Sequence, residues 1–300
     1  MERRTFLGAL AAALAGCTSN PSITTPTTEP RTTTTVRRPT TAPPTTVRPV
    51  VEMLDPPPGP FTDAVFALGV ASGDPDGDSV VLWTRLMATA TDSLPDAIQL
   101  LWEVAYDQDF TELAATGITD IGSGFAHAAH VVAGDLPAAT SFFYRFRVGD
   151  AVSPVGRTKT MAAAGTMPAR LRLGVSSCQL METGYWAAHR DLAAAEVDVV
   201  LWLGDFIYGG GGSSQYEGRA HRGSDPIGLG AYRSRYAQYR EDPVLQACSA
   251  AHPWVVTWDD HEVVNDYDAS VDPARRAAAY QAWWEHQPTR VPAPGSAGFD

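Results

Sequence analysis

Short runs of alternating apolar and polar residues recur between residues 66 and 148. The clearest is FFYRFRV at 142–148, in which every second residue is apolar. Such alternation predicts strands with one buried face, and turn-forming sequences such as GDPDGD at 73–78 separate them. Strands are expected at Phe66–Val70, Ser79–Arg85, Ile98–Tyr106, His130–Val132 and Ser141–Val148. The pattern predicts an N-terminal β-sandwich over residues 59–165.

The turn at 73–78 also carries alternating carboxylates, as calcium-binding loops do. It lacks the later bidentate glutamate of such loops and is flanked by predicted strands, so a hairpin turn is the favoured interpretation. Nothing in the predicted β-sandwich indicates catalysis.

From residue 166 onward the pattern changes to buried-type apolar runs with a helical stretch between them. The runs and the helical stretch lie at 171–175, 184–196, 197–203 and 254–258. Strand, helix and strand in this order predict an α/β domain over residues 166–300. Ligands of open α/β sheets collect beyond the carboxyl ends of the strands, where Cys178 and Asp205 fall.

The first 17 residues have the pattern of an export signal. Arg3 and Arg4 precede the apolar run 8–16, as in twin-arginine signals, and LAGC at 14–17 resembles a lipobox. We therefore expect export by the twin-arginine route and attachment to the outer face of the cell membrane through lipidated Cys17. The alternative is an ordinary secretory leader with Cys17 unmodified, which would leave the protein periplasmic or extracellular.

Residues 18–58 are dominated by threonine and proline, with almost no apolar periodicity. Such a composition cannot bury a core and favours extended, solvated chain. This segment is predicted to be a disordered, semi-rigid linker between the membrane and the folded part.

The formal charge is −12, from 34 acidic and 22 basic residues. This balance argues against a general nucleic-acid binder, and no sequence-specific nucleic-acid binding is expected. The three cysteines imply no disulfide framework, although Cys178 and Cys248 could pair in an oxidising compartment. We expect a monomer.

The end of the second apolar run carries a possible metal-ligand set. Asp205 is followed by Tyr208 and a glycine run, and Cys178 ends the neighbouring predicted strand. A carboxylate can bridge two cations, and a thiolate or phenolate suits a ferric ion. Taken singly, Cys178 could be a small buried residue, Asp205 a cap and Tyr208 a core aromatic. Their joint position at adjacent strand ends favours a metal site.

The third apolar run ends in four successive polar side chains, Asp259, Asp260, His261 and Glu262. Burying this group would be costly unless water or cations neutralised it, which indicates a divalent metal site. The near-neutral intrinsic pKa of histidine suits His261 to donating a proton or a hydrogen bond to a phosphoryl oxygen.

Several motifs in the same order resemble the PhoD-like alkaline phosphatases over residues 61–292. The motifs are FALGVASGDP at 66–75, VLWTR at 81–85, SSCQ at 176–179, LWLGDFIYGG at 201–210, YRSRYAQYREDP at 232–243, HPWVVTWDDHEVVND at 252–266 and AYQAWWEHQPTR at 279–290. The resemblance implies an α/β protein in which a β-sandwich precedes a four-layer αββα calcineurin-like metallophosphoesterase domain. It also implies Fe3+ and Ca2+ as cofactors and phosphate esters as substrates.

The resemblance assigns site residues as well. Cys178, Asp205 and Tyr208 correspond to iron ligands, with Asp205 shared with calcium, and Asp260 corresponds to a further metal ligand. His261 corresponds to the phosphate-contacting histidine of the catalytic site, and Asn265 is a weaker candidate for a catalytic position. Asp259 is a weaker candidate, and three arginines of the segment 232–240 could contact an anionic substrate.

The family continues beyond the last of these motifs and supplies further Asp and His ligands, so we expect the N-terminal part of a metallophosphatase domain here. The implied reaction is hydrolysis of phosphomonoesters, phosphodiesters or both by metal-activated water. One alternative is a lipid-anchored binding protein that keeps the fold without catalysis. Another is a nuclease or a phospholipase D-like phosphodiesterase.

Overall fold

The computed structural model describes residues 51–90, 93–210, 214–295 and 298–299. The expected export signal with Cys17, and the expected linker up to residue 50, lie outside the described residues. Residues 51–62 contain no helix or strand. None of the helices in the described ranges combines the length and the apolar character needed to cross a bilayer.

The N-terminal half consists almost entirely of short strands, as the alternating pattern predicts. Its elements are η1 (Asp63–Phe66), β1 (Val70–Gly73), β2 (Val80–Arg85), β3 (Ala97–Ala105), β4 (Leu113–Gly122), η2 (Ser123–Phe125), β5 (Ala128–Ala133), β6 (Ser141–Val148), β7 (Ala151–Val152) and β8 (Gly156–Lys159). β6 has the predicted bounds, and β2 and β3 differ from the predicted strands by single residues. The sequence pattern did not predict β4, β7 or β8.

The predicted strand Phe66–Val70 is wrong in its position. Residues 63–66 form a 3-10 helix, and Gly69, with a φ of 71°, turns the chain before β1 begins at Val70. Glycine adopts this left-handed conformation without steric cost, which allows the abrupt change from helix to strand.

The C-terminal half alternates strands with helices. Its elements are β9 (Leu173–Ser176), η3 (Met181–Thr183), α2 (Ala187–Ala194), β10 (Val199–Leu203), α3 (Leu229–Arg240), α4 (Pro243–Ala251), β11 (Pro253–Thr257) and α5 (Pro273–His286). Helices α4 and α5 begin in the same way, because Asp242 and Asp272 accept backbone N–H groups and a proline occupies the first turn. An aspartate cap followed by proline fixes where each helix starts.

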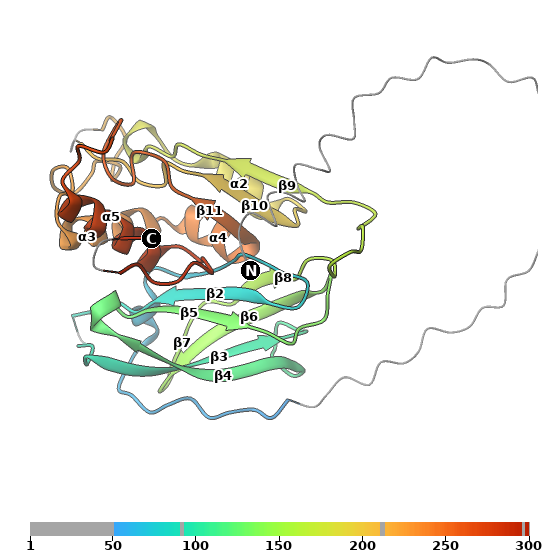
Figure 1. Ribbon diagram of the computed structural model, residues 1–300. Coiled ribbons are helices and arrows are strands. Elements are labelled where there is room, and N and C mark those ends of the chain that lie inside the picture. Colours follow the sequence, from blue (N-terminus) through green and yellow to red (C-terminus); the bar gives the residue numbers. More distant parts are fainter. Residues whose placement is uncertain (1–50, 91–92, 211–213, 296–297, 300) are drawn as a thin grey trace, which may run out of the picture. The chain divides into compact units, whose positions relative to one another are not determined.

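Strands of both halves share one sheet (Figure 1). The six-stranded sheet has the order β5-β2-β1-β11-β10-β9, with β1 parallel to β11 and β9, β10 and β11 parallel to one another. The five-stranded sheet has the order β4-β3-β6-β7, with β8 also paired to β6. The expected domain boundary after residue 165 lies in the connection between β8 and β9 and does not separate the sheets.

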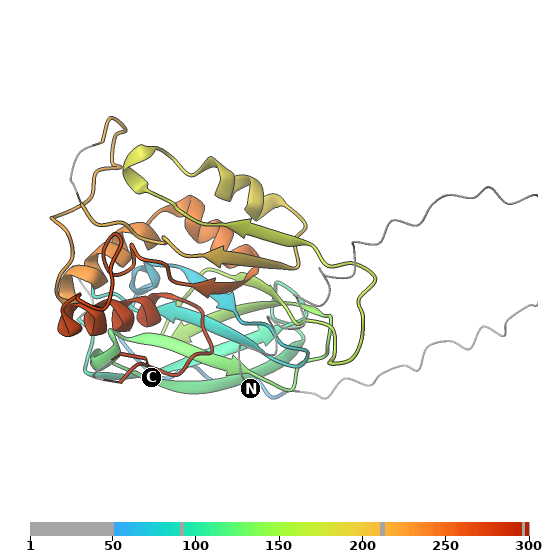
Figure 2. The same cartoon turned by 45° about the horizontal axis from the view of Figure 1, so that its top comes forward.

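Two cores lie on opposite faces of the six-stranded sheet. One joins apolar side chains of β1, β2 and β5 to those of β3, β4 and β6, so the two sheets pack face to face in this region. The other joins β10 and β11 to α3, α4 and α5. Figure 2 shows the helices on the side of the shared sheet away from β3 and β4.

The far end of the shared sheet has a partly uncovered apolar face. Val175, Leu201 and Val255 are in register across β9, β10 and β11. Val175 is 59% exposed, and Leu203 on β10 is 53% exposed. Within the described residues, this end of the sheet carries helices on one face, and the second sheet expected for a four-layer αββα arrangement does not lie on the other.

The buried carboxylate of Glu285 links α5 to α3 and interacts electrostatically with an arginine of β2. Glu285 on α5 is fully buried and accepts two hydrogen bonds from the guanidinium of Arg233 on α3, at 2.6 and 2.7 Å. Burial lowers the pKa of Arg85 on β2 to about 10, and the negative charge of Glu285 opposes this shift. The carboxylate therefore compensates cations from both halves of the chain.

We expect removal of this carboxylate to destabilise the protein much more than removal of a surface one. Glu285→Ala leaves buried Arg85 and partly buried Arg233 without a compensating carboxylate, which costs about 3 kcal/mol or more. Glu241→Ala breaks the exposed pair with Arg222 and should cost less than about 1 kcal/mol. Urea unfolding of both variants measures the difference, and equal midpoints would contradict the structural role given to Glu285.

Candidate metal centre

Three parallel strands bring the candidate residues to one edge of the sheet. β9, β10 and β11 are neighbours that run in the same direction, so their carboxyl ends lie together. Cys178 follows β9, Asp205 follows β10, and Asp260 and His261 follow β11. The site predicted from the sequence is therefore located where ligands of open α/β sheets bind.

The backbone at this edge adopts unusual conformations. Cys178 and Asp205 both have a φ near 60°, at 60° and 58°, although neither is glycine. Left-handed conformations cost non-glycine residues about 1 kcal/mol or more, and they cluster at functional sites. They turn the chain sharply after β9 and β10 and place the two side chains beside the strand ends.

Gly204 allows the loops after β10 and β11 to meet. Its φ is 99°, and a Cβ atom on it would lie 2.5 Å from Cβ of Asp259 and 2.6 Å from the Asp259 nitrogen. No side chain fits in that space, so glycine is required for the close approach of the two loops.

Glu262 joins the same two loops through its carboxylate. Its side chain is fully buried and accepts backbone N–H groups of Asp205 at 3.1 Å, Phe206 at 2.5 Å and Asp259 at 2.9 Å. Burial raises the pKa of Glu262 to about 7, assisted by the nearby Asp205 charge, while the three N–H donors act in the opposite direction. Three backbone amides, in place of the water or cations expected from the sequence, therefore satisfy the oxygens of Glu262.

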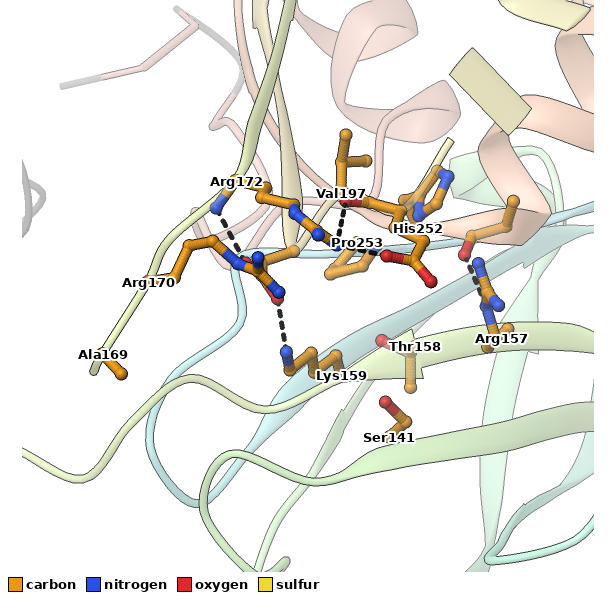
Figure 3. Close-up of a pocket in the computed structure, with 13 residues that line it drawn as sticks. Ser141, Arg157, Thr158, Lys159, Ala169, Arg170, Arg172, Val197, His252 and Pro253 are labelled. Carbon is orange, nitrogen blue, oxygen red and sulfur yellow. Dashed lines mark hydrogen bonds and ion pairs between the residues drawn. The ribbon is translucent and has the colours of Figure 1, made fainter. Parts of the chain in front are cut away.

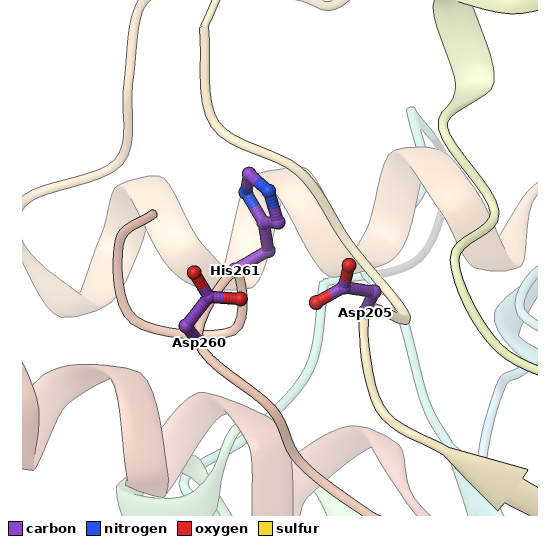
Figure 4. A group of neighbouring side chains, drawn as sticks. All are labelled: Asp205, Asp260 and His261. Carbon is purple, nitrogen blue, oxygen red and sulfur yellow. The ribbon is translucent and has the colours of Figure 1, made fainter. Parts of the chain in front are cut away.

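Asp205, Asp260 and His261 lie close enough together to hold a metal ion and are called the metal-binding cluster below (Figure 4). One ligand atom of each lies within 4.8 Å of the others. Oδ1 of Asp205 is buried and has no hydrogen-bond partner among the described residues. A buried carboxylate oxygen without a partner is costly, and a cation would satisfy it. The three residues therefore fit a metal ion.

Tyr208 and Cys178 adjoin this cluster. The Tyr208 hydroxyl donates to Oδ2 of Asp205 at 2.7 Å, and its ring lies 4.2 Å from the His261 ring. Burial raises the pKa of Tyr208 well above its usual value, with Asp205 and then Cys178 acting in the same direction. Cys178 is exposed and, like buried Cys248, is a free thiol, so the two do not form the disulfide considered from the sequence.

Asn265 lies apart from the cluster. Its side chain is exposed and donates to the Asp266 carboxylate at 2.6 Å. Asp266 in turn donates its N–H to Asp260, so Asn265 reaches the metal-binding cluster only through a neighbour. Asp259 is exposed, and its backbone N–H donates a hydrogen bond to the Glu262 carboxylate.

The arginines considered as substrate contacts are engaged inside the protein. Arg233 is held by Glu285, and Arg240 is buried and donates to the His286 carbonyl. Arg235 donates to the backbone carbonyl of Tyr208, which fixes the loop that carries this phenol. This positioning role of Arg235 could not be predicted from the sequence, because it depends on how α3 packs beside the loop after β10.

Both halves of the chain match families of known proteins. Residues 53–162 match the family described as "PhoD-like phosphatase, N-terminal domain", and residues 173–298 match "PhoD-like phosphatase". Both descriptions are those of phosphatases, and together the matches span most of the described chain. The chain belongs to the PhoD-like phosphatase family, which confirms the resemblance seen in its motifs.

The relatives are longer than this chain. Alkaline phosphatase D of Bacillus subtilis (strain 168) is 42% identical over 247 residues, and the match covers 77% of this chain and 42% of that protein. A solved structure described as "Structure of PhoD" matches with a TM-score of 0.73 and 42% identity, covering 78% of this chain and 48% of that chain. The chain thus spans less than half the length of these two relatives.

Glu262→Ala should strongly destabilise the protein. The substitution leaves three N–H groups without their acceptor, and each buried group left unsatisfied costs about 1–3 kcal/mol. We expect a loss of about 3 kcal/mol or more for Glu262→Ala and a smaller loss for Glu262→Gln, whose side-chain oxygen still accepts. Urea unfolding tests this, and a loss below about 1 kcal/mol in Glu262→Ala would contradict the assignment.

Proposed function

We propose that the protein is an exported, metal-dependent phosphohydrolase that cleaves phosphomonoesters, phosphodiesters or both. The observation that carries the proposal is the convergence of Asp205, Asp260 and His261 at the carboxyl edge of a parallel sheet. The family supports phosphate-ester hydrolysis, and the unpartnered Oδ1 of Asp205 supports the need for a cation.

Two kinds of ligand meet at the metal-binding cluster, which supports a proposal for the metals. Asp205 and Asp260 would hold a hard cation such as Ca2+ through carboxylate oxygens. Tyr208 and Cys178 beside Asp205 would suit Fe3+, whose charge displaces the phenol and thiol protons. A bound cation supplies Lewis acidity toward phosphoryl oxygens and activates water for attack on phosphorus.

His261 would act on the phosphate ester itself. It is half-buried beside the carboxylates of Asp205 and Asp260, and packing against Tyr208 fixes the orientation of its ring. From this position its imidazole would donate a hydrogen bond to a phosphoryl oxygen, or a proton to the departing alkoxide. The contacts of Asn265 give it no comparable role, so its catalytic assignment stays a prediction from the resemblance.

Export and anchoring belong to the same proposal and depend on the sequence alone. The twin-arginine pattern at Arg3-Arg4 and the lipobox at Cys17 support delivery of a folded protein to the outer face of the membrane. A metal centre assembled before export is compatible with that route. The substrate would then be a phosphate ester met outside the cytoplasm.

The test is turnover of p-nitrophenyl phosphate and bis(p-nitrophenyl) phosphate by the full chain with added Ca2+ and Fe3+. We expect measurable hydrolysis that is abolished by EDTA and restored by the metals. His261→Gln should lower kcat by about a hundredfold or more. Asp260→Asn should reduce both metal content and turnover, and Asp191→Asn, the same charge change on the exposed surface of α2, should change neither.

Measuring bound metal together with turnover distinguishes a hydrolase from a binding protein of the same fold. Turnover with bound metal supports the hydrolase, and comparison of the two substrates gives its preference. Stoichiometric metal without turnover would favour a binding protein that keeps the fold. If iron is bound, Cys178→Ala should remove the thiolate contribution to the visible charge-transfer absorption and leave that of the Tyr208 phenolate, and an unchanged spectrum would contradict the thiolate ligand.

A further inference from the structure

One segment of this acidic protein carries only positive charge. Residues 151–181 contain Arg157, Lys159, Arg170 and Arg172 and no aspartate or glutamate. The whole chain has 34 acidic and 22 basic residues, so such a segment departs from the average composition. A local excess of cations in a protein of net charge −12 raises the local concentration of anions.

These four cations line one cavity (Figure 3). The cavity has a volume of about 520 Å³, within the usual range for sites that bind small ligands. It lies between β8, which carries Arg157 and Lys159, and the amino ends of β9, β10 and β11. Arg170 and Arg172 enter from the connection that leads into β9.

Two of the cations are neutralised by the carboxylates of the lining. Lys159 pairs with Asp198, and Arg172 pairs with Glu196 at 2.5 Å. Partial burial raises the pKa of Asp198, but hydrogen bonds from Lys159 and the Arg172 N–H outweigh this and keep the pKa below its usual value. Asp198 is therefore ionised near neutral pH, and both carboxylates are already engaged by the two cations.

The other two cations are available to a ligand. Arg157 donates its Nε to the Ala251 carbonyl at 3.2 Å. Within the described part of the chain, neither Arg157 nor Arg170 has a carboxylate partner, and both side chains are exposed. The cavity consequently has a net positive charge from two guanidinium groups, whose planar donors match phosphate or carboxylate oxygens.

The lining indicates the chemical class of the ligand. Among the described residues, no Phe, Tyr or Trp lines the cavity, so this lining offers no aromatic platform for stacking a nucleobase. The volume of about 520 Å³ greatly exceeds the roughly 30 Å³ that one water molecule occupies, and it accommodates more than a single phosphate group. A small anion with several charged groups would fill the space and contact both arginines.

The cavity is separate from the metal-binding cluster. It lies at the amino ends of the parallel strands, whereas Asp205 and His261 lie beyond the carboxyl ends. The five residues of β10 at about 3.3 Å each place the two regions roughly 15 Å apart. A ligand in the cavity would therefore bind without contacting a metal ion.

We propose that this cavity binds a small polyvalent phosphate anion through Arg157 and Arg170. The inference does not depend on the proposed hydrolase activity. It predicts binding that persists when the metals have been removed, and it predicts a stronger interaction with a chain of phosphates than with one phosphate.

Isothermal titration calorimetry of the full chain in EDTA, at low ionic strength, tests the proposal with sodium tripolyphosphate and with inorganic phosphate as the probes. We expect saturable binding of one tripolyphosphate, at least tenfold tighter than inorganic phosphate. Arg170→Ala should weaken tripolyphosphate binding about fivefold to tenfold. Because Arg170 is exposed, this substitution should leave the fold intact.

Arg190→Ala is the matched control, since it removes an exposed arginine of α2 outside the cavity. It should change the tripolyphosphate affinity less than twofold. Arg157→Ala gives a second test and should weaken binding to the same degree as Arg170→Ala. Absence of binding at millimolar tripolyphosphate, or equal losses in Arg190→Ala and Arg170→Ala, would overturn the proposal.

Discussion

The buried carboxylate of Glu262 is the constraint on which the metal-binding cluster depends. Its two oxygens accept three backbone N–H groups, from Asp205 and Phe206 after β10 and from Asp259 after β11. The loops that carry Asp205 on one side and Asp260 with His261 on the other are thereby fixed together. Gly204 makes the contact possible, because any side chain there would collide with Asp259. A site whose ligands come from separate loops needs such support to keep its geometry.

The edge of the sheet that carries the metal-binding cluster also contains locally unfavourable features. Cys178 and Asp205 have left-handed backbone conformations, and Oδ1 of Asp205 has no hydrogen-bond partner among the described residues. Both features are unfavourable in the absence of a ligand. Besides Glu262, the stabilising contacts lie elsewhere, in the two cores of the shared sheet and in the pair of buried Glu285 with Arg233. Pairing of β1 with β11 makes the N-terminal strands part of the sheet that positions the site.

Much of this organisation could be predicted from the sequence, and the exceptions have physical reasons. β6 has the predicted bounds because its alternation is complete, and the polar residues after β9, β10 and β11 marked the correct edge of the sheet. β4 was missed because most of its residues are partly exposed on both faces, which removes the alternation. The roles of Asp260 and Glu262, only two residues apart, could not be separated without knowing how the two loops meet. The placement of Arg235 against Tyr208 likewise depends on helix packing.

The central claim is that Asp205 and Asp260, held in place by Glu262, bind a metal ion beside His261. The most direct measurement is an anomalous difference map from crystals of the chain grown with Mn2+, recorded at wavelengths on either side of the manganese absorption edge. The account predicts a peak between the two carboxylates, within coordination distance of Oδ1 of Asp205. A map with no peak there at saturating Mn2+, or with the ion bound only elsewhere on the protein, would contradict it.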